Sequence, residues 1–473
     1  MINKVRGAMT LPSKVQKVLD DWNVDYTLAE NAPLSATSPV FNMPGISHNT
    51  AQISILEDDI GRIQVIYPAT HILDLNKLAS ATSRQLTPLD RDKVKQLQQG
   101  LNLEAIPALP QVTGLDTYVD ETLLSLSSIE MSLNDKEHLQ IPMSDFQTLV
   151  SSACVGSYCS VVPKNAIPGA EWAKKDVPQI NQVVRDFTQL RIHQRLEETL
   201  DMPPMPETAQ KIIDLRMDPD AETEELAKLV SQDPGLAAQV ISWANSPYYG
   251  ISGSIVNVQE AVVRVLGFDL VINLALGLSL GRTLDVPKDG PQGYTPFWQQ
   301  SVYTAAMMSE MVRTLPPGSR PTQGIAYLCG LLHNFGFLIL GHVFPPHFNM
   351  VNRHIEANPQ INRYYLEQHL MKLTREQISS NLFKQWGIPD EVCTAIRYQN
   401  EPSYDGEHST LSRMLYVSSR MLRQYDLNDA PFEPVPEHLI TELNIDQDKA
   451  EAALEKVLEN KDDLQEMARL LKS

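Results

Sequence analysis

From about residue 201 to residue 425 the sequence is almost entirely helical in pattern, and this feature limits the fold more than any other. Apolar residues recur at the three- and four-residue spacing of amphipathic helices, and short turns separate the segments. Asp233 is expected to cap a helix that begins at Pro234, because aspartate accepts from free backbone N–H groups and proline is tolerated in a first helical turn. The pattern predicts a large all-α domain. The separating turns read Asp233-Pro-Gly, Asn245-Ser-Pro, Pro316-Pro-Gly and Gly387-Ile-Pro.

The chain divides into four parts by the texture of its sequence. Residues 1–165 mix helix and strand signals, among them a short amphipathic helix at 13–21 with Val15, Val18 and Leu19 on one side and a turn between two strands at Asp58-Asp59-Ile60-Gly61. Residues 166–200 are expected to form a proline-containing linker and a connecting helix that starts at Pro178. Residues 201–425 are expected to form the helical domain, and residues 426–473 a C-terminal helical extension that packs on it and is broken near Asn460. The predicted fold class is multidomain: an α+β domain, then an all-α domain, then a C-terminal helix.

Motifs along the helical region occur in a distinctive order. They resemble the HDOD domain, a helical relative of the HD phosphohydrolases, over most of the region. The resemblance implies a role in bacterial signal transduction, often without catalysis. The motifs that carry it are Asp201-Met-Pro-Pro-Met-Pro, Asp233-Pro-Gly-Leu, Trp243-Ala-Asn-Ser-Pro-Tyr-Tyr-Gly, Glu260-Ala-Val-Val-Arg-Val-Leu-Gly, Cys329-Gly-Leu-Leu-His-Asn-Phe-Gly and Trp386-Gly-Ile-Pro-Asp-Glu-Val-Cys.

The HD phosphohydrolases hold one or two metal ions with several histidines and aspartates, and the metal activates a water molecule. By the resemblance, Gln300 stands at the first ligand histidine, and the signature His-Asp pair reads His333-Asn334. Arg375 stands at the next histidine, where a guanidinium would repel a divalent cation. A catalytic metal usually needs three protein ligands, so His333 alone predicts neither a metal site nor a cofactor.

The remaining ligand positions are also altered. Gln399 and Asn400 replace the paired histidines, and a late aspartate falls near Ser418 or Ser419. His333 is expected to be a partly buried, hydrogen-bonded histidine. The other histidines of this region are predicted to be surface or loop residues: His342, His347, His354 and His369. The candidate groove for a partner helix or a small anionic ligand, such as a nucleotide second messenger bound by Arg375, is lined by Gln300, His333, Asn334, Arg375, Gln399 and Asn400.

The first domain resembles the YbaK/prolyl-tRNA deacylase family. The resemblance implies a lysine on the strand before the acidic turn, yet Gln52 lies near that position and no lysine occurs between Lys17 and Lys77. The family's glycine-rich substrate loop corresponds to a segment without glycine, which weakens close approach of the backbone to a ligand. We expect a domain that has lost catalysis. Its motifs are Leu11-Pro-Ser-Lys-Val-Gln-Lys-Val-Leu, Gly61-Arg-Ile-Gln-Val-Ile-Tyr-Pro, Glu104-Ala-Ile-Pro-Ala-Leu-Pro and Thr117-Tyr-Val-Asp.

Composition and charge limit the partners and the cellular location that we expect for this protein. A formal net charge of −19 argues against general binding of nucleic acids, which relies on lysine and arginine. No stretch of about 20 apolar residues is apparent, so membrane insertion is not expected. The N-terminus is not followed by an apolar signal core, which favours a cytoplasmic location. The cysteines form no Cys-x-x-Cys pair and are expected to be reduced structural thiols: Cys154, Cys159, Cys329 and Cys393.

These observations predict a non-catalytic signalling or scaffold protein that works by binding protein partners through its helical domain. Two alternatives stay open. A metal-dependent HD-type phosphohydrolase would contain bound metal, and an aminoacyl-tRNA binding or editing module would show a basic patch within residues 1–160. A homodimer is also open, because the C-terminal helix could pack on its own body or on a second subunit.

Overall fold

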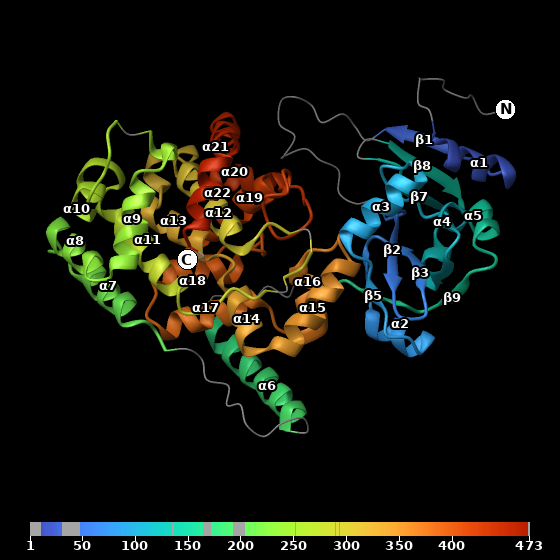
Figure 1. Ribbon diagram of the computed structural model, residues 1–473, viewed down its shortest axis with the longest axis horizontal. Coiled ribbons are helices and arrows are strands. Elements are labelled where there is room, and N and C mark those ends of the chain that lie inside the picture. Colours follow the sequence, from blue (N-terminus) through green and yellow to red (C-terminus); the bar gives the residue numbers. More distant parts are fainter. Residues whose placement is uncertain are drawn as a thin grey trace.

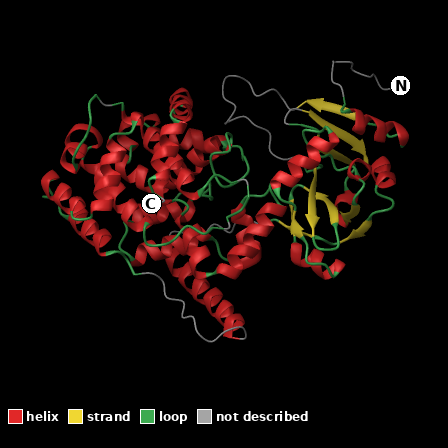
Figure 2. Cartoon of the chain, in the orientation of Figure 1, coloured by secondary structure: helices red, strands yellow, loops and turns green. Residues whose placement is uncertain are grey.

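The computed structural model describes residues 11–30, 48–134, 137–163, 172–192, 204–250, 252–288, 290–292 and 294–471. Figure 1 shows a smaller domain, coloured blue to teal, beside a larger helical domain coloured green to red. The strands, yellow in Figure 2, gather in the smaller domain. The structure therefore confirms the predicted fold class, an α+β domain followed by an all-α domain and C-terminal helices.

The described strands of the N-terminal domain form three sheets. The largest has the order β5-β2-β3-β6-β9, with β2 antiparallel to β3 and β6 parallel to both of its neighbours. The others have the orders β1-β8-β7 and β10-β4. The strands are β1 (Thr27–Glu30), β2 (Ala51–Glu57), β3 (Arg62–Pro68), β4 (His71–Leu73), β5 (Thr87–Pro88), β6 (Asp116–Asp120), β7 (Ser128–Ser132), β8 (Glu137–Pro142), β9 (Cys154–Gly156) and β10 (Cys159–Val161).

Helices cover these sheets, and the sequence predicted the first of them correctly. That helix buries its apolar stripe of Val15, Val18 and Leu19 against the domain core. The predicted acidic turn between β2 and β3 is also present, with Asp58 accepting from the backbone N–H groups of Ile60 and Gly61 at 2.9 and 3.1 Å. The helices here are α1 (Ser13–Asp21), α2 (Leu75–Thr82), α3 (Arg91–Leu101), α4 (Pro110–Thr113) and α5 (Met143–Leu149).

The connecting helix differs from its prediction. Helix α6 (Trp172–Ile192) begins six residues before the predicted start and keeps Pro178 inside it, while residues 164–171 and 193–203 lie outside the described part. A proline within a helix removes one hydrogen bond and normally interrupts the helix. Contacts with the helical domain offset this cost, because Asp176 is buried and accepts from Gln377 at 2.8 Å and from Arg397.

The helical domain has one continuous apolar core that includes the C-terminal helices. Helices α21 and α22 pack on α12 and are separated near Asn460, as predicted. The helices are α7 (Glu207–Met217), α8 (Thr223–Ser231), α9 (Pro234–Ala244), α10 (Val258–Glu260), the π-helix η3 (Ala261–Leu266), α11 (Phe268–Gly281), α12 (Phe297–Met311), α13 (Gln323–Leu332), α14 (Phe335–Val343), α15 (Pro345–Ala357), α16 (Arg363–Met371), α17 (Arg375–Gln385), α18 (Asp390–Tyr398), α19 (Ser409–Arg423), α20 (Glu437–Leu443), α21 (Gln447–Glu459) and α22 (Lys461–Arg469).

One apolar stretch, which the sequence analysis overlooked, has the length and composition of a membrane span. It runs from Gln323 to Val343 with a mean hydropathy of 1.6. In the structure 89% of this stretch is buried inside the helical domain. The stretch forms helices at the centre of this domain. Gly330 lets the backbone of α13 lie directly against α12, because a Cβ added at this residue would lie 2.5 Å from the Cα of Ala305.

The two domains dock through α15, the residue that follows it and the last turn of α16, and both helices are orange beside the sheet domain in Figure 1. Asn358 accepts from Leu73 N at 2.6 Å and donates to Leu73 O at 3.0 Å, so it pairs with that residue as a neighbouring strand would. Ser54 and Tyr67 both donate to Ala357 O, at 2.6 and 2.9 Å. Ala357 belongs to an apolar cluster of the N-terminal domain, so the cores of the two domains interlock.

Two histidines at this interface correct the sequence analysis. His354 is buried, with 2% of its surface exposed, and its Nε2 accepts from Leu75 N at 3.3 Å. His369 is half-buried, and its Nε2 lies 2.9 Å from Asp74 Oδ2. Neither is a surface or loop residue as predicted, because both lie on helices that the N-terminal domain covers. His342 is exposed, as expected.

Candidate functional site

A cleft with a volume of about 930 Å³ opens beside the start of α12. Three of the six predicted groove residues line it: Gln300, Asn334 and Arg375. Tyr294 and Asp429, which the sequence analysis did not select, line it as well. The remaining three predicted residues, His333, Gln399 and Asn400, are buried and are not among the residues that line the cleft.

Gln300, Asn334 and Arg375 form a hydrogen-bonded series. Gln300 stands in the first turn of α12, and its Oε1 accepts from Asn334 Nδ2 at 2.9 Å. Asn334 separates α13 from α14, and its Oδ1 accepts from Arg375 Nη1 at 3.1 Å. The two amides therefore use their functional atoms on each other and on the arginine. The structure therefore brings together residues that the resemblance places at metal-ligand positions, but these residues are hydrogen-bonded to one another.

Local sequence fixes the position of Arg375. It is the first residue of α17, after a capping box in which Thr374 and Gln377 satisfy each other's backbone N–H groups. The motif that contains His333 also contains Gly336, where an added Cβ would lie 2.3 Å from the backbone oxygen of Arg375. Glycine at 336 thus allows α14 to approach the start of α17 closely enough for Asn334 to reach the guanidinium.

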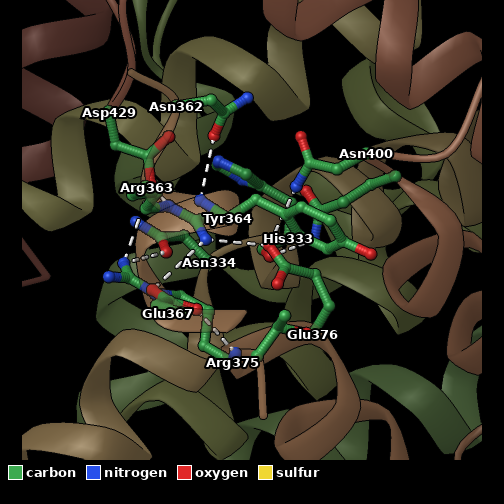
Figure 3. A network of polar contacts seen from close by, with 12 residues as sticks. His333, Asn334, Asn362, Arg363, Tyr364, Glu367, Arg375, Glu376, Asn400 and Asp429 are labelled. Atoms are coloured by element: carbon green, nitrogen blue, oxygen red, sulfur yellow. Dashed lines mark hydrogen bonds and ion pairs between the residues drawn. The ribbon is translucent and has the colours of Figure 1, made fainter. Parts of the chain in front are cut away.

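Two arginines and three carboxylates form a buried arginine–carboxylate network beneath the cleft (Figure 3). Its members are at most 2% exposed and are Arg363, Glu367, Arg375, Glu376 and Asp429.

Arg363 lies at the centre of this network. It pairs with Asp429 through Nε, and its Nη1 lies 2.8 Å from Glu376 Oε1 and 3.6 Å from Glu367 Oε1. Arg375 Nε lies 2.5 Å from Glu367 Oε1, and its backbone N donates to Glu367 Oε2 at 2.9 Å.

The electrostatics of the network follow from burial and pairing. Burial alone would lower the pKa of Arg363, but the charges of Asp429, Glu376 and Glu367 raise it well above its usual value. Burial would also raise the pKa of Asp429, yet the arginines around it hold that pKa far below its ordinary range. Glu367 differs, because burial raises its pKa and the neighbouring Glu376 adds to this effect. The arginines carry a fixed positive charge among these carboxylates.

His333 is buried and hydrogen-bonded inside the helical domain, where the sequence predicted a partly buried, hydrogen-bonded histidine. It is 2% exposed, and its Nδ1 donates to Gly330 O at 2.7 Å, which leaves Nε2 as an unprotonated acceptor with no partner among the described residues. Burial lowers the pKa of His333 to about 4, so the ring is neutral at physiological pH. Gln399 donates to His333 O at 2.7 Å, and Asn400 donates to Glu376 Oε1 at 3.0 Å.

These residues do not fit a divalent metal ion. His333 Nε2 and Glu376 Oε2 have no partner among the described residues, but each carboxylate of the network is paired with a guanidinium, which repels a second cation. Within the described ranges, no group of three or more His, Cys, Asp or Glu side chains is placed to hold a metal. Ser418 and Ser419, which stand where the resemblance places a late aspartate, bond within the core, to Met308 Sδ and Tyr416 O.

Sequence reasoning missed Arg363, Glu367, Glu376 and Asp429. Arg363 and Glu367 are spaced i, i+4, a pattern that usually indicates an exposed helical pair. The sequence did contain a signal for the network. Arg375 and Glu376 are a second arginine and glutamate close along the chain, again among apolar residues that the core requires. Charged residues repeated within a buried helical segment indicate an internal network.

Comparison with known proteins agrees with this architecture. A model of the HDOD domain family matches residues 202–402. The crystal structure of a candidate signal transduction protein from Marinobacter aquaeolei VT8 is 38% identical, covers 98% of this chain and 100% of that chain, and superposes with a TM-score of 0.85.

Two further similarities are narrower. An uncharacterised curated protein of Treponema pallidum (strain Nichols) is 24% identical over 250 residues, which are 53% of this chain and 47% of that protein. The match therefore spans about half the length of this relative. The N-terminal region aligns with 95% of a candidate trans-editing enzyme for prolyl tRNA synthetase, at 16% identity, over 31% of this chain and with a TM-score of 0.25.

The relative from Marinobacter extends over nearly the whole chain, and the family model covers the helices that build the cleft and its network. The chain thus belongs to the HDOD domain family, with an α+β domain in front of its HDOD domain.

Proposed function

We propose that this chain is a non-catalytic signal transduction protein whose HDOD domain acts by binding protein partners. The observation that carries the proposal is Arg363, which pairs with three carboxylates at the centre of the buried network. The Marinobacter relative, described as a candidate signal transduction protein, supports the signalling role.

The network explains why phosphoester hydrolysis is not expected. A metal hydrolase needs a cation with an open coordination position, which binds water and lowers its pKa. A guanidinium supplies positive charge but no coordination position, and it stays protonated at any physiological pH. Each carboxylate of the buried network is paired with an arginine, so we expect none of the three to act as a general base for water.

Docking of the two domains supports a regulatory arrangement. The N-terminal domain contacts α15 and α16 through Asn358 and His369, and Arg363 and Glu367 also lie on α16. One helix therefore has residues in the interface and in the network. We expect a partner bound at one domain to alter the other through this helix, since packed cores shift as units.

Metal analysis of the full chain tests the proposal. The protein is stripped with EDTA, incubated separately with Mn²⁺, Mg²⁺ and Zn²⁺, and desalted before its metal content and its hydrolysis of bis(p-nitrophenyl) phosphate are measured. The proposal predicts far less than one metal ion per chain and no hydrolysis above that of the His333→Ala variant. Stoichiometric metal with turnover that disappears in His333→Ala would establish the phosphohydrolase alternative instead. The variant separates activity of this site from that of a contaminant.

A further inference from the structure

Two hydrogen-bond donors at the cleft have no acceptor among the residues that the structure describes. Arg375 is 2% exposed, and its Nη2 has no partner in the part of the chain that the structure describes, although Nε and Nη1 are both bonded. The hydroxyl of Tyr294, which also lines the cleft, is buried and without a partner in the same sense. Buried donors are normally satisfied, so two of them at one cavity indicate an acceptor that completes the site.

The walls beside these donors are aromatic. Phe337 lies under Arg375, with the guanidinium carbon 5.4 Å from the ring centroid. Phe297 stacks on Phe337 at 6.0 Å with an interplanar angle of 14°, and Trp298 meets Phe297 edge-on at 4.9 Å. All three rings line the cleft. Ligand pockets commonly combine such apolar walls with a few fixed polar groups, in volumes of about 300–1,000 Å³.

The charge around the cleft permits an anion. Asp429 lines it, but Arg363 pairs with this carboxylate, and Arg375 and Arg423 lie 3.7 and 3.8 Å from its oxygens. Lys288, Arg282 and Asp285 also line the cleft, and Arg282 is paired with Asp233, its Nη1 lying 2.9 Å from Asp233 Oδ2. A guanidinium with one unused N–H is a strong donor to carboxylate, phosphate or sulfonate oxygens.

We propose that this cleft binds an organic anion with a flat apolar body. The anionic group accepts from Arg375 Nη2 and Tyr294 OH, and the ring system lies against Phe297, Trp298 and Phe337. This inference deepens the proposed function by naming a class of ligand for the cleft. It rests on that function in one respect, because it requires a site that binds without a metal ion. A nucleoside monophosphate and an aromatic carboxylic acid share this chemistry and are separate arms of the test.

The test compares two fluorescent probes that differ in charge, 8-anilinonaphthalene-1-sulfonate and the neutral N-phenyl-1-naphthylamine. Each is titrated into the full chain in EDTA. The sulfonate is expected to bind at one saturable site. Its affinity is expected to fall about fivefold in Tyr294→Phe and about tenfold in Arg375→Lys, since each variant loses one donor to the anion.

The controls separate the anion contact from folding. The affinity of the neutral probe should stay within about twofold in both variants, because its contacts are apolar. Tyr425→Phe and Arg313→Lys, at exposed positions, should bind both probes as the unaltered chain does. Tyr294→Phe keeps the test readable if Arg375→Lys fails to fold, because the Tyr294 hydroxyl has no described protein partner to lose.

Competition then identifies the ligand class. Displacement of the bound sulfonate probe by guanosine monophosphate or by indole-3-carboxylate supports the proposal and selects its source. Absence of saturable binding, equal affinity in all variants, or failure of both competitors would overturn it and leave the proposed function intact. Binding that appears only when Mn²⁺ replaces EDTA would instead overturn the metal-free function on which the inference rests.

Discussion

The two domains stabilise buried carboxylates in different ways. In the N-terminal domain, Asp120 accepts from the backbone N–H groups of Thr122, Tyr158 and Cys159 at 3.0, 2.8 and 2.8 Å. In the HDOD domain, Asp429 is instead surrounded by arginine side chains. Backbone donors are neutral and are set by the local fold. Arginine partners are charged and come from separate helices, so loss of one leaves several buried charges unbalanced.

This difference between backbone and arginine partners predicts that the largest loss of stability follows substitution of Arg363. Arg363→Met should lower the free energy of unfolding by about 3–5 kcal/mol, because Asp429, Glu376 and Glu367 lose their shared cation while remaining buried. Urea denaturation followed by far-ultraviolet circular dichroism measures this effect. Arg313→Met, whose side chain is 65% exposed, should change the free energy by no more than about 0.5 kcal/mol. A loss below about 1 kcal/mol for Arg363→Met would contradict the proposed role of the network.

The second effect is the pH dependence that His333 contributes. Burial lowers its pKa from 6.5 to about 4, so the unfolded chain binds the proton more readily than the folded chain between these values. Stability therefore falls as pH decreases through this window, by up to about 3 kcal/mol. His333→Gln should remove that part of the pH dependence in urea denaturation between pH 7 and 4. The exposed-site variant His342→Gln should keep it, and parallel profiles for all three proteins would refute the assignment.

A smaller effect is expected at Asp120, and it sharpens the comparison. Burial acts to raise the pKa of Asp120, but hydrogen bonds from the Thr122 hydroxyl and from three backbone N–H groups give a net lowering. Asp120→Asn keeps one acceptor oxygen and should cost about 1–2 kcal/mol in the same denaturation experiment. Asp59→Asn in the exposed turn should be neutral. If Asp120→Asn cost as much as Arg363→Met, the distinction between backbone and arginine partners would fail.

The smallest effect concerns the interface between the domains. Burial opposes ionisation of Asp74, yet the hydrogen bond from His369 and the other contacts lower its pKa to about 2. A double-mutant cycle of Asp74→Ala and His369→Gln should give a coupling free energy of about 0.5–1 kcal/mol. The cycle is needed because Asp74 also caps α2, a contribution of about 1 kcal/mol that is independent of His369. Strictly additive losses would show that the pair does not help to hold the domains together.

The sequence predicted those parts of the fold that local patterns determine. The stripe of Val15, Val18 and Leu19 gave α1, and the turn at Asp233 and Pro234 gave the start of α9. The predicted start of α6 was wrong. The contacts of Asp176 with Arg397 outweigh the tendency of Pro178 to begin a helix rather than to lie inside one. Local patterns do not contain such distant contacts.

The candidate site was predicted in part for the same reason. Motif order brought Gln300, Asn334 and Arg375 together, and the structure places all three at one cleft. The partners of Arg375 could not be read from the sequence, because a salt bridge depends on how α16 and α17 pack. Asp429 lies in a loop far along the chain, and only the folded structure brings it to Arg363.

Diffraction from crystals soaked in Mn²⁺, recorded at wavelengths on both sides of the manganese absorption edge, tests the central claim most directly. We predict no anomalous peak among His333, Glu376 and Asp429, and clear density for the Arg363 guanidinium between the two carboxylates. A manganese peak there, with Arg363 turned away, would show that the arginine can yield its place to a catalytic metal.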